Sequence, residues 1–153
     1  MKFIISAIGK LNKKKPEQAL IDDYLKKTKW PVSICESEEK KSLTGDLLKE
    51  AEEKLLWKNV PDNAKVIVLD ERGDELSSRE LARKIASWRD TGIQTIAFLI
   101  GGADGHTQNT RDKADVVLSM GRLTLPHFLA RVVLIEQIYR AKTIIEGHPY
   151  HRD

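Results

Sequence analysis

Short apolar runs alternate along this chain with segments in which apolar residues recur every three or four positions. Two of the runs, at residues 66–69 and 95–100, are apolar throughout and rich in β-branched side chains. Such uninterrupted runs are typical of strands buried on both faces of a parallel sheet. Further strands are predicted at residues 1–9, 32–35 and 116–118. The pattern therefore predicts a mostly parallel sheet with helices between its strands.

Helix signals fill the intervening segments. Pro16 stands where a first helix would begin, Ser42 or Thr44 can cap a second, and Ser77 with Glu80 forms a capping box for a third. We expect the second helix to turn its apolar side to the core and its charged side to solvent. The apolar residues are Leu47, Leu48, Ala51 and Leu55, and the charged ones are Lys49, Glu50, Glu52, Glu53 and Lys54. Because the alternation has no linker or shift in composition, we expect a single α/β domain over residues 1–153.

Charged residues at positions 70–75 follow the run at 66–69 and are interpreted as a loop. The last predicted helix, at residues 126–146, carries two apolar stripes where a helix covering one sheet face needs only one. The stripes are Phe128, Val132, Ile135 and Tyr139, and Leu134, Ile138, Ala141 and Ile145. A second stripe needs a second covering element. A twofold homodimer is the commonest source of one, and we favour it over a central helix buried within one chain.

Two predicted strand ends carry small-residue loops. Residues 101–105, Gly-Gly-Ala-Asp-Gly, end one apolar run, and residues 119–126 lead from the next run into the last helix. In open α/β sheets, ligands bind at the carboxyl ends of strands. Gly101 and Gly102 let a ligand approach the backbone, and three apolar side chains can wall a slot that suits an adenine ring and a sugar. These side chains are Met120, Leu123 and Leu125. Glycines that serve only tight turns are the competing interpretation.

Composition narrows the choice of compartment. The chain is 41% hydrophobic and 32% charged, as in an ordinary soluble globular protein. Its first nine residues are apolar but too short to cross a bilayer, so we expect no membrane segment and no signal peptide. Cys35 is the single cysteine, and no group of Cys and His has zinc spacing, so we expect a cytoplasmic protein without a metal.

Positive charge is mild overall but clustered. The net charge is +3, from 26 Lys and Arg against 23 Asp and Glu. The lysine clusters can contact a phosphate backbone, although a solvated surface is equally consistent with them. They comprise Lys10, Lys13, Lys14 and Lys15, then Lys26, Lys27 and Lys29, and finally Lys40 and Lys41.

Several enzyme motifs are absent from the sequence, among them the phosphate loop of nucleotide triphosphatases, the dinucleotide fingerprint and the nucleophile elbow. The tail at residues 148–152 combines two imidazoles, a phenol and a guanidinium. Groups that stack, donate hydrogen bonds and pair with charge suit RNA recognition. A tail that only docks against the body of the protein is the alternative.

Four motifs agree in order and spacing with one known family. They are Leu-Ile-Gly-Gly-x-x-Gly at 99–105, Leu-Thr-Leu-Pro-His at 123–127, Tyr-Arg-Ala at 139–141 and His-Pro-Tyr-His-Arg at 148–152. Together they resemble the ribosomal RNA large subunit methyltransferase H family of the SPOUT superfamily, over the whole chain. The resemblance implies an α/β fold with a carboxy-terminal trefoil knot, which the alternation of elements does not itself predict.

The resemblance also implies an activity. Members of the family act as homodimers on the assembled ribosome and use S-adenosylmethionine to methylate N3 of a pseudouridine in the helix 69 loop of bacterial 23S rRNA. Carried over by position, the cofactor contacts fall on Leu69, Gly102, Gly121, Arg122, Leu123, Thr124, Leu125 and Pro126. Ala103 and Asp104 stand where the family often has proline or glutamate, and Gly121 and Arg122 also depart from its pattern. Since backbone groups and apolar walls would bind the cofactor, neither departure is expected to abolish binding.

The tail supplies the candidate reaction residues. We assign Tyr150 and Arg152 to substrate contact, and His148 or His151 to the base, because an imidazole accepts a proton near neutral pH. Glu136 and Arg140 on the last helix are further candidates.

Two other functions are alternatives to the methyltransferase that the resemblance implies. One is a non-catalytic RNA- or ribosome-binding protein, in which the glycine loop is structural. The other is a small nucleotide-binding sensor, which leaves the tail unexplained. The paired loops favour the methyltransferase, because a pure binding module has no reason to hold them together.

Overall fold

Five parallel strands form the centre of the computed structural model, which describes residues 1–152. The strands are β1 (Lys2–Ile8), β2 (Val32–Ser37), β3 (Lys65–Glu75), β4 (Thr95–Ile100) and β5 (Val116–Ser119). Their order across the sheet is β2-β1-β4-β3-β5, and every neighbouring pair runs parallel. The predicted α/β class with a parallel sheet is confirmed, whereas the trefoil knot stays a prediction.

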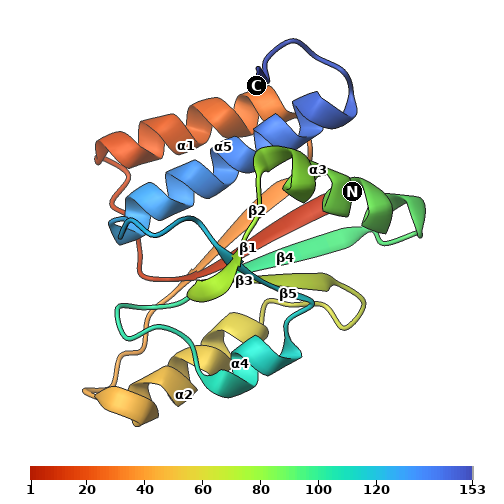
Figure 1. Ribbon diagram of the computed structural model, residues 1–153. Helices are drawn as coiled ribbons and strands as arrows, with labels where there is room; N and C mark the ends of the chain where they lie inside the picture. Colours follow the sequence, from red (N-terminus) through yellow and green to blue (C-terminus); the bar gives the residue numbers. More distant parts are fainter. Residues whose placement is uncertain (153) are drawn as a thin grey trace.

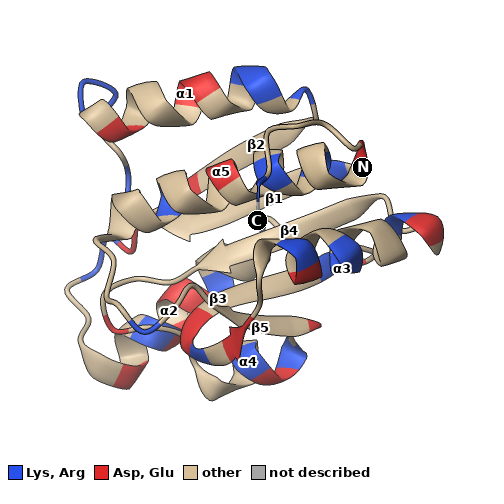
Figure 2. Ribbon diagram, turned by 45° about the horizontal axis from the view of Figure 1, so that its top comes forward, with Lys and Arg blue, Asp and Glu red and all other residues tan. Residues whose placement is uncertain are grey.

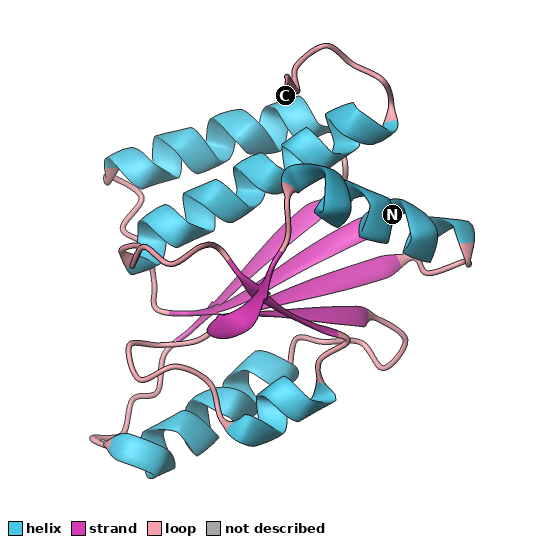
Figure 3. Ribbon diagram, viewed as in Figure 1, coloured by secondary structure: helices cyan, strands magenta, loops and turns pink. Residues whose placement is uncertain are grey.

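Helices cover both faces of the sheet (Figures 1 and 3). One face carries α1 (Pro16–Thr28), α3 (Ser78–Asp90) and α5 (His127–Ile145), and the other carries α2 (Gly45–Trp57) and α4 (Gln108–Lys113). Successive side chains of a strand point to opposite faces, so β4 contributes to the core on both. Phe98 packs in the larger cluster under α1, α3 and α5, while its neighbour Leu99 packs in the smaller cluster under α2. Both side chains are fully buried, which explains the uninterrupted apolar run.

The capping box at the start of α3 is confirmed. The Glu80 backbone N–H donates to Ser77 Oγ at 3.2 Å, and the Ser77 backbone N–H donates to Glu80 Oε2 at 2.7 Å. Hydrogen bonds from the Ser77 backbone N–H and hydroxyl to the Glu80 carboxyl lower its pKa. Thr44, by contrast, precedes α2 without a side-chain capping hydrogen bond. Across residues 1–152, no helix combines the length and apolarity that crossing a membrane requires.

The predicted orientation of α2 is confirmed for Leu55, which packs against the smaller core cluster, and is wrong for Leu47 and Glu52. Leu47 is 64% exposed, whereas Glu52 is only 7% exposed and shares its buried line with Leu56. Residues 48, 52 and 56 lie four positions apart and so fall on one helix face. A carboxyl side chain stands on that face because the helix packs against a glycine loop there, which the apolar pattern could not indicate.

The charged segment at residues 70–75 is not a free loop, so that prediction was wrong as well. β3 continues through it after a register shift, and Asp74 and Glu75 pair with Leu118 and Ser119 of β5. The two backbones pass very close at Gly73, where an added Cβ would lie 2.5 Å from the carbonyl oxygen of Val117. The strand therefore bends across the end of β5 instead of leaving the sheet.

Helix α5 is the central helix of its layer. It packs between α1 and α3, and both of its apolar stripes are buried within the chain (Figure 1). Ile135 of the first stripe and Ile138 of the second are each 0% exposed. The interpretation of the second stripe as a dimer contact was wrong, because three helices on one sheet face cover the middle one from both sides. The homodimer stays a prediction without that support.

Candidate functional site

The loops after β3, β4 and β5 surround a cavity of about 690 Å³ at the carboxyl edge of the sheet. The cavity volume falls in the range of small-molecule and cofactor sites. Its walls come from the ends of β3 and β4, the glycine loop at 101–105, and the segment that connects β5 to α5. This edge is where parallel α/β sheets bind ligands.

Seven of the eight predicted cofactor residues line this cavity. They are Leu69, Gly102, Gly121, Arg122, Leu123, Thr124 and Leu125. The eighth, Pro126, precedes the first turn of α5 and is not part of the lining. Leu123 is 85% exposed, so an apolar side chain stands at the rim with no protein surface to cover it. The parallel sheet thus brings together loops that are far apart in the sequence.

The start of α5 is anchored beside the cavity. The Nε2 atom of His127, which lines the cavity, donates to the carbonyl oxygen of Ile8 at 2.7 Å. Arg131 is 1% exposed, and its guanidinium donates to Glu36 at 2.5 Å and to the carbonyl of Gly9 at 3.2 Å. These bonds fix the helix against the ends of β1 and β2.

His106 is a site residue that the sequence reasoning missed. It is 4% exposed, lines the cavity, and accepts a hydrogen bond on Nε2 from the Gly101 backbone N–H at 3.1 Å. Burial lowers its pKa, against the charge of Asp70 and hydrogen bonds to the backbone of Leu69 and Leu99. A lone histidine in a loop has no periodic pattern, so the only sequence signal was its position directly after the glycine loop.

A buried ion pair lies next to His106. Arg111 Nη1 donates to Asp70 Oδ2 at 3.1 Å and to the carbonyl of His106 at 2.9 Å. The two charged side chains are 11% and 7% exposed. The pair ties α4 to the end of β3, and removing either partner would leave an uncompensated charge.

Glu52 packs behind the glycine loop. A Cβ added to Gly102 would lie 2.6 Å from Glu52 Oε2, so this position needs glycine because of the close approach. Glu52 Oε1 is buried and has no hydrogen-bond partner among the residues that the structure describes. Burial raises the pKa of the Glu52 carboxyl, and the charges of Asp104 and Glu39 add to the effect. Helix α2 therefore packs against the glycine loop of the cavity through the Glu52 carboxyl group.

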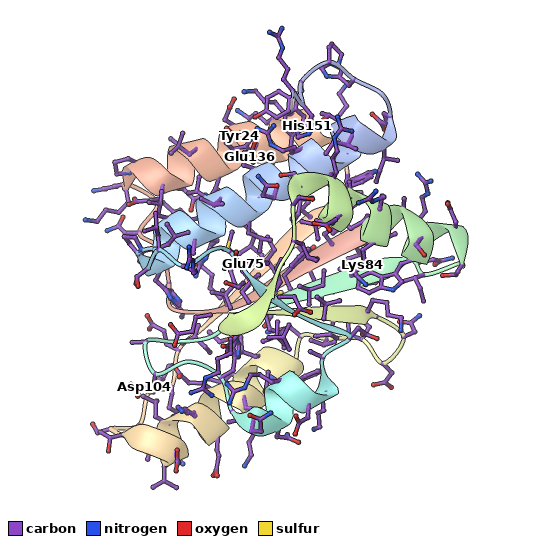
Figure 4. All side chains as sticks on the ribbon, in the orientation of Figure 1. Tyr24, Glu75, Lys84, Asp104, Glu136 and His151 are labelled. Carbon is purple, nitrogen blue, oxygen red and sulfur yellow. The ribbon has the colours of Figure 1, made fainter. Side chains whose placement is uncertain are left out.

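The predicted reaction residues lie elsewhere. In the part of the chain that the structure describes, none of the four lines the cavity: His148, Tyr150, His151 and Arg152. Figure 4 shows His151 with Tyr24 and Glu136 at the α1 and α5 layer, away from Asp104 beside α2. Glu136 follows the cavity residue His127 by nine positions on α5, which is about 14 Å along the helix axis.

Docking onto α5 holds the tail in place. The Tyr150 hydroxyl donates to Glu136 Oε1 at 2.9 Å, and the Arg140 guanidinium lies 4.8 Å from the centre of the Tyr150 ring. Arg140 also donates to Glu136, and its Nη1 lies 3.2 Å from His151 Nδ1. Burial raises the pKa of the Tyr150 phenol, helped by hydrogen bonds to Glu136 and Tyr24. The phenol is therefore a hydrogen-bond donor and not a base.

No group of three or more His, Cys, Asp and Glu residues that could hold a metal ion occurs within residues 1–152. The cavity walls instead combine apolar side chains, glycine backbone and a few charged groups.

Comparison with known proteins identifies relatives along the full chain. Residues 1–151 match the family described as predicted SPOUT methyltransferase. A protein of Paramagnetospirillum magneticum is 47% identical over 152 residues, with 99% of each chain covered, and one of Paracoccus denitrificans is 46% identical over 161 residues, with 100% covered. Both are named ribosomal RNA large subunit methyltransferase H.

Solved structures share the fold. A probable methylase family protein from Haemophilus influenzae superposes with a TM-score of 0.57 at 13% identity, covering 99% of this chain and 70% of that one. A putative RNA methyltransferase from Bacillus anthracis gives a TM-score of 0.55 at 11% identity, covering 97% and 96%. At such identities these structures support the fold alone.

Proposed function

Because this chain belongs to the SPOUT methyltransferase family, among the ribosomal RNA large subunit methyltransferase H proteins, we propose that it methylates 23S rRNA with S-adenosylmethionine. The target we propose is N3 of the helix 69 pseudouridine on the assembled bacterial ribosome, which places the enzyme in the cytoplasm. One observation carries the proposal. The three loops that the family resemblance assigns to the methyl donor surround one cavity of suitable size.

The residues that line the cavity fit such a donor. Leu69, Leu123 and Leu125 can exclude water around a purine and a sugar, while the backbone of the glycine loop can bind polar atoms. When bound, the sulfonium supplies an electrophilic methyl group. The protein then has to hold the target nitrogen in line with the methyl and accept the imide proton, and proximity alone supplies much of the rate.

The tail residues assigned to the reaction do not line the cavity of their own chain, so they require a second chain to reach a bound donor. In its own chain the tail docks on α5, away from the cavity. We propose a twofold homodimer in which each tail serves the cavity of its partner. A hollow of about 280 Å³ adjoins the cavity, and Leu76 and Val133 contribute to its apolar wall. Leu129, 40% exposed on α5, adds apolar surface for a partner.

The direct test is methyl transfer from labelled S-adenosylmethionine to ribosomes of a strain that lacks the endogenous enzyme, with the modified base located in the RNA. Label at the helix 69 pseudouridine is the expected result. Donor binding by calorimetry without any label would keep the donor site and reject the substrate. Absence of both would favour the non-catalytic RNA-binding protein.

Mixing experiments test the shared site. A chain ending at Gly147 lacks the tail, and Gly102→Trp disrupts the glycine loop of the cavity, because its side chain would meet Glu52. Each should be inactive alone, but their mixture should recover activity if a tail serves the partner's cavity. A mixture that stays inactive although light scattering shows dimers would reject the shared site, and a mass of one chain at micromolar concentration would reject the dimer.

The salt dependence of ribosome binding tests whether the lysines between β1 and α1 contact the phosphate backbone. Lys13 and Lys14 lie in the segment between β1 and α1, at the same sheet edge as the cavity, whereas Lys26 lies in the last turn of α1 and Lys29 at its C-cap. Figure 2 shows basic residues at both ends of α1. Replacing Lys13 and Lys14 by Gln should weaken ribosome binding and reduce the slope of log affinity against log salt by roughly 1.5 to 2.

The matched control for that change is Lys26→Gln with Lys29→Gln, which should leave the salt slope as it is. Binding to ribosomes would be titrated over a range of KCl concentrations for both double variants. If the slope of log affinity against log salt is equal in both variants and in the unmodified chain, the lysines between β1 and α1 do not contact the RNA and are a solvated surface.

A further inference from the structure

His106 connects the two strand ends that form the floor of the cavity. Its imidazole is buried under the glycine loop, and a Cβ added to Gly101 would lie 3.1 Å from the ring. The ring accepts a hydrogen bond from the Gly101 N–H and lies against the backbone of Leu69 in β3 and Leu99 in β4. One side chain thus sets the spacing between the glycine loop and the end of β3.

The hydrogen bond from Gly101 defines the protonation state of the ring. The backbone N–H is the donor, so Nε2 must present a lone pair and the ring proton must lie on Nδ1. An imidazolium has no lone pair to offer, so protonation would set two N–H groups against each other at 3.1 Å. Since the ring is 4% exposed, water could not separate them.

A second link joins His106 to the cavity wall. Its carbonyl accepts a hydrogen bond from Arg111, which also pairs with Asp70. Asp70 follows Leu69 directly and lines the cavity, as do Gly101 and His106 themselves. A displacement of the imidazole would therefore move both the glycine loop and the end of β3.

Four charged groups surround this part of the floor. Asp70 of β3 favours a proton on His106, whereas Arg111 of α4 opposes it. Asp104 in the glycine loop and Glu52 of α2, which packs against Gly102, are the acidic groups on the other side of the loop. Burial outweighs the charge of Asp70, since the pKa of His106 lies below its ordinary value.

We propose that His106 is a positioning residue of the methyl-donor site, whose unprotonated ring holds the Gly101 amide and the end of β3 in the arrangement that binds the donor. The inference rests on the proposed function, because it concerns the same cavity. It adds a residue that makes donor affinity depend on pH. Affinity should be constant while the ring is neutral and should fall as pH drops through the His106 pKa, below the ordinary histidine range.

Two substitutions separate the hydrogen bond from the shape of the side chain. In His106→Gln an amide oxygen can still accept from the Gly101 N–H but does not titrate. In His106→Leu that N–H has no partner in the arrangement that binds the donor. The donor-free chain avoids this cost by leaving that arrangement, so donor binding has to supply it, which corresponds to about a tenfold loss of affinity.

The experiment measures the Kd of S-adenosylmethionine by calorimetry between pH 5 and pH 8. The unmodified chain should lose about tenfold in affinity per pH unit once His106 is protonated. H106Q should bind within about threefold of the unmodified chain at pH 8 and lose this pH dependence. H106L should bind about tenfold more weakly than the unmodified chain at pH 8, and its affinity should not change with pH. His127 is the other histidine of the cavity, so the pH dependence should persist in H127Q.

Ring chemical shifts of His106 give a second readout that does not depend on a variant folding. Donor binding should lower the pKa of His106, because the complex requires the neutral ring. The inference is overturned if H106Q keeps the pH dependence, if H127Q removes it, or if the pKa of His106 is the same with and without donor. If the unmodified chain binds no donor at any pH, the proposed function is rejected, and the role proposed for His106 is rejected with it.

Discussion

Replacing both tail histidines by alanine should lower the rate of methyl transfer by about a hundredfold or more while the donor is saturating. His148 and His151 are the imidazoles assigned to accept the imide proton, and general bases contribute on the order of a hundredfold to ten-thousandfold. Neither histidine lines the cavity, so the Kd of S-adenosylmethionine should stay within about twofold, less than 0.5 kcal/mol. Single-turnover transfer to unmethylated ribosomes measures the rate, and calorimetry measures the Kd.

A tail contact must be separated from the chemistry in that experiment. His151 lies 3.2 Å from Arg140, so its loss also weakens the docking of the tail on α5. Arg140→Ala removes the same contact and leaves both imidazoles in the chain. If the rate fell equally in R140A and in the double variant, tail placement would account for the loss. Unchanged turnover in the double variant would exclude a histidine base.

The largest effect on stability is expected at Gly73. A Cβ there would lie 2.5 Å from the carbonyl oxygen of Val117 and 2.7 Å from the carbonyl carbon of Leu118, and backbone atoms cannot move aside as a side chain can. Gly73→Ala should lower the free energy of unfolding by about 3 kcal/mol or more, as overpacking without room to relax does. Chemical denaturation at a fixed protein concentration measures the change.

Gly92→Ala is the matched control for Gly73→Ala. Gly92 has φ +90° and nothing within 4 Å of an added Cβ, so it tests backbone strain without a clash. Its cost should be about 1 kcal/mol. A cost for G73A no larger than that for G92A would mean that the crossing of β3 and β5 can widen. If G73A cannot be refolded while G92A can, the loss of stability in G73A is at least as large as expected.

Features that depend on neighbouring residues could be predicted from the sequence. The run at 95–100 is apolar because β4 lies at the centre of the sheet with helices on both sides. The capping box of Ser77 and Glu80 lies within one helical turn, so its hydrogen bonds form wherever that helix begins. The loops of the cavity could be recognised because strand ends in a parallel sheet meet at one edge.

Features set by distant contacts could not be predicted in the same way. Glu52 is buried because a glycine loop fifty residues later leaves room for its carboxyl group. The segment at 70–75 is charged, yet it remains in the strand because it crosses β5. His106 lies against the ends of β3 and β4, and Arg111 forms an ion pair with Asp70. His106 and Arg111 each have a polar partner that no local pattern of the sequence indicates.

The order of the strands in the sheet has a consequence for folding of the chain during its synthesis. β4 pairs with β1 on one side and with β3 on the other, so Thr95 meets Lys2 and Ile96 meets Lys65. Until β4 has left the ribosome, the β1–β2 unit and β3 share no strand pairing and expose apolar edges. The fold closes late through contacts between distant residues, and such topologies fold slowly. Nascent chains of this protein therefore pass through a period of aggregation risk that ends only when residues 95–100 insert between the two halves.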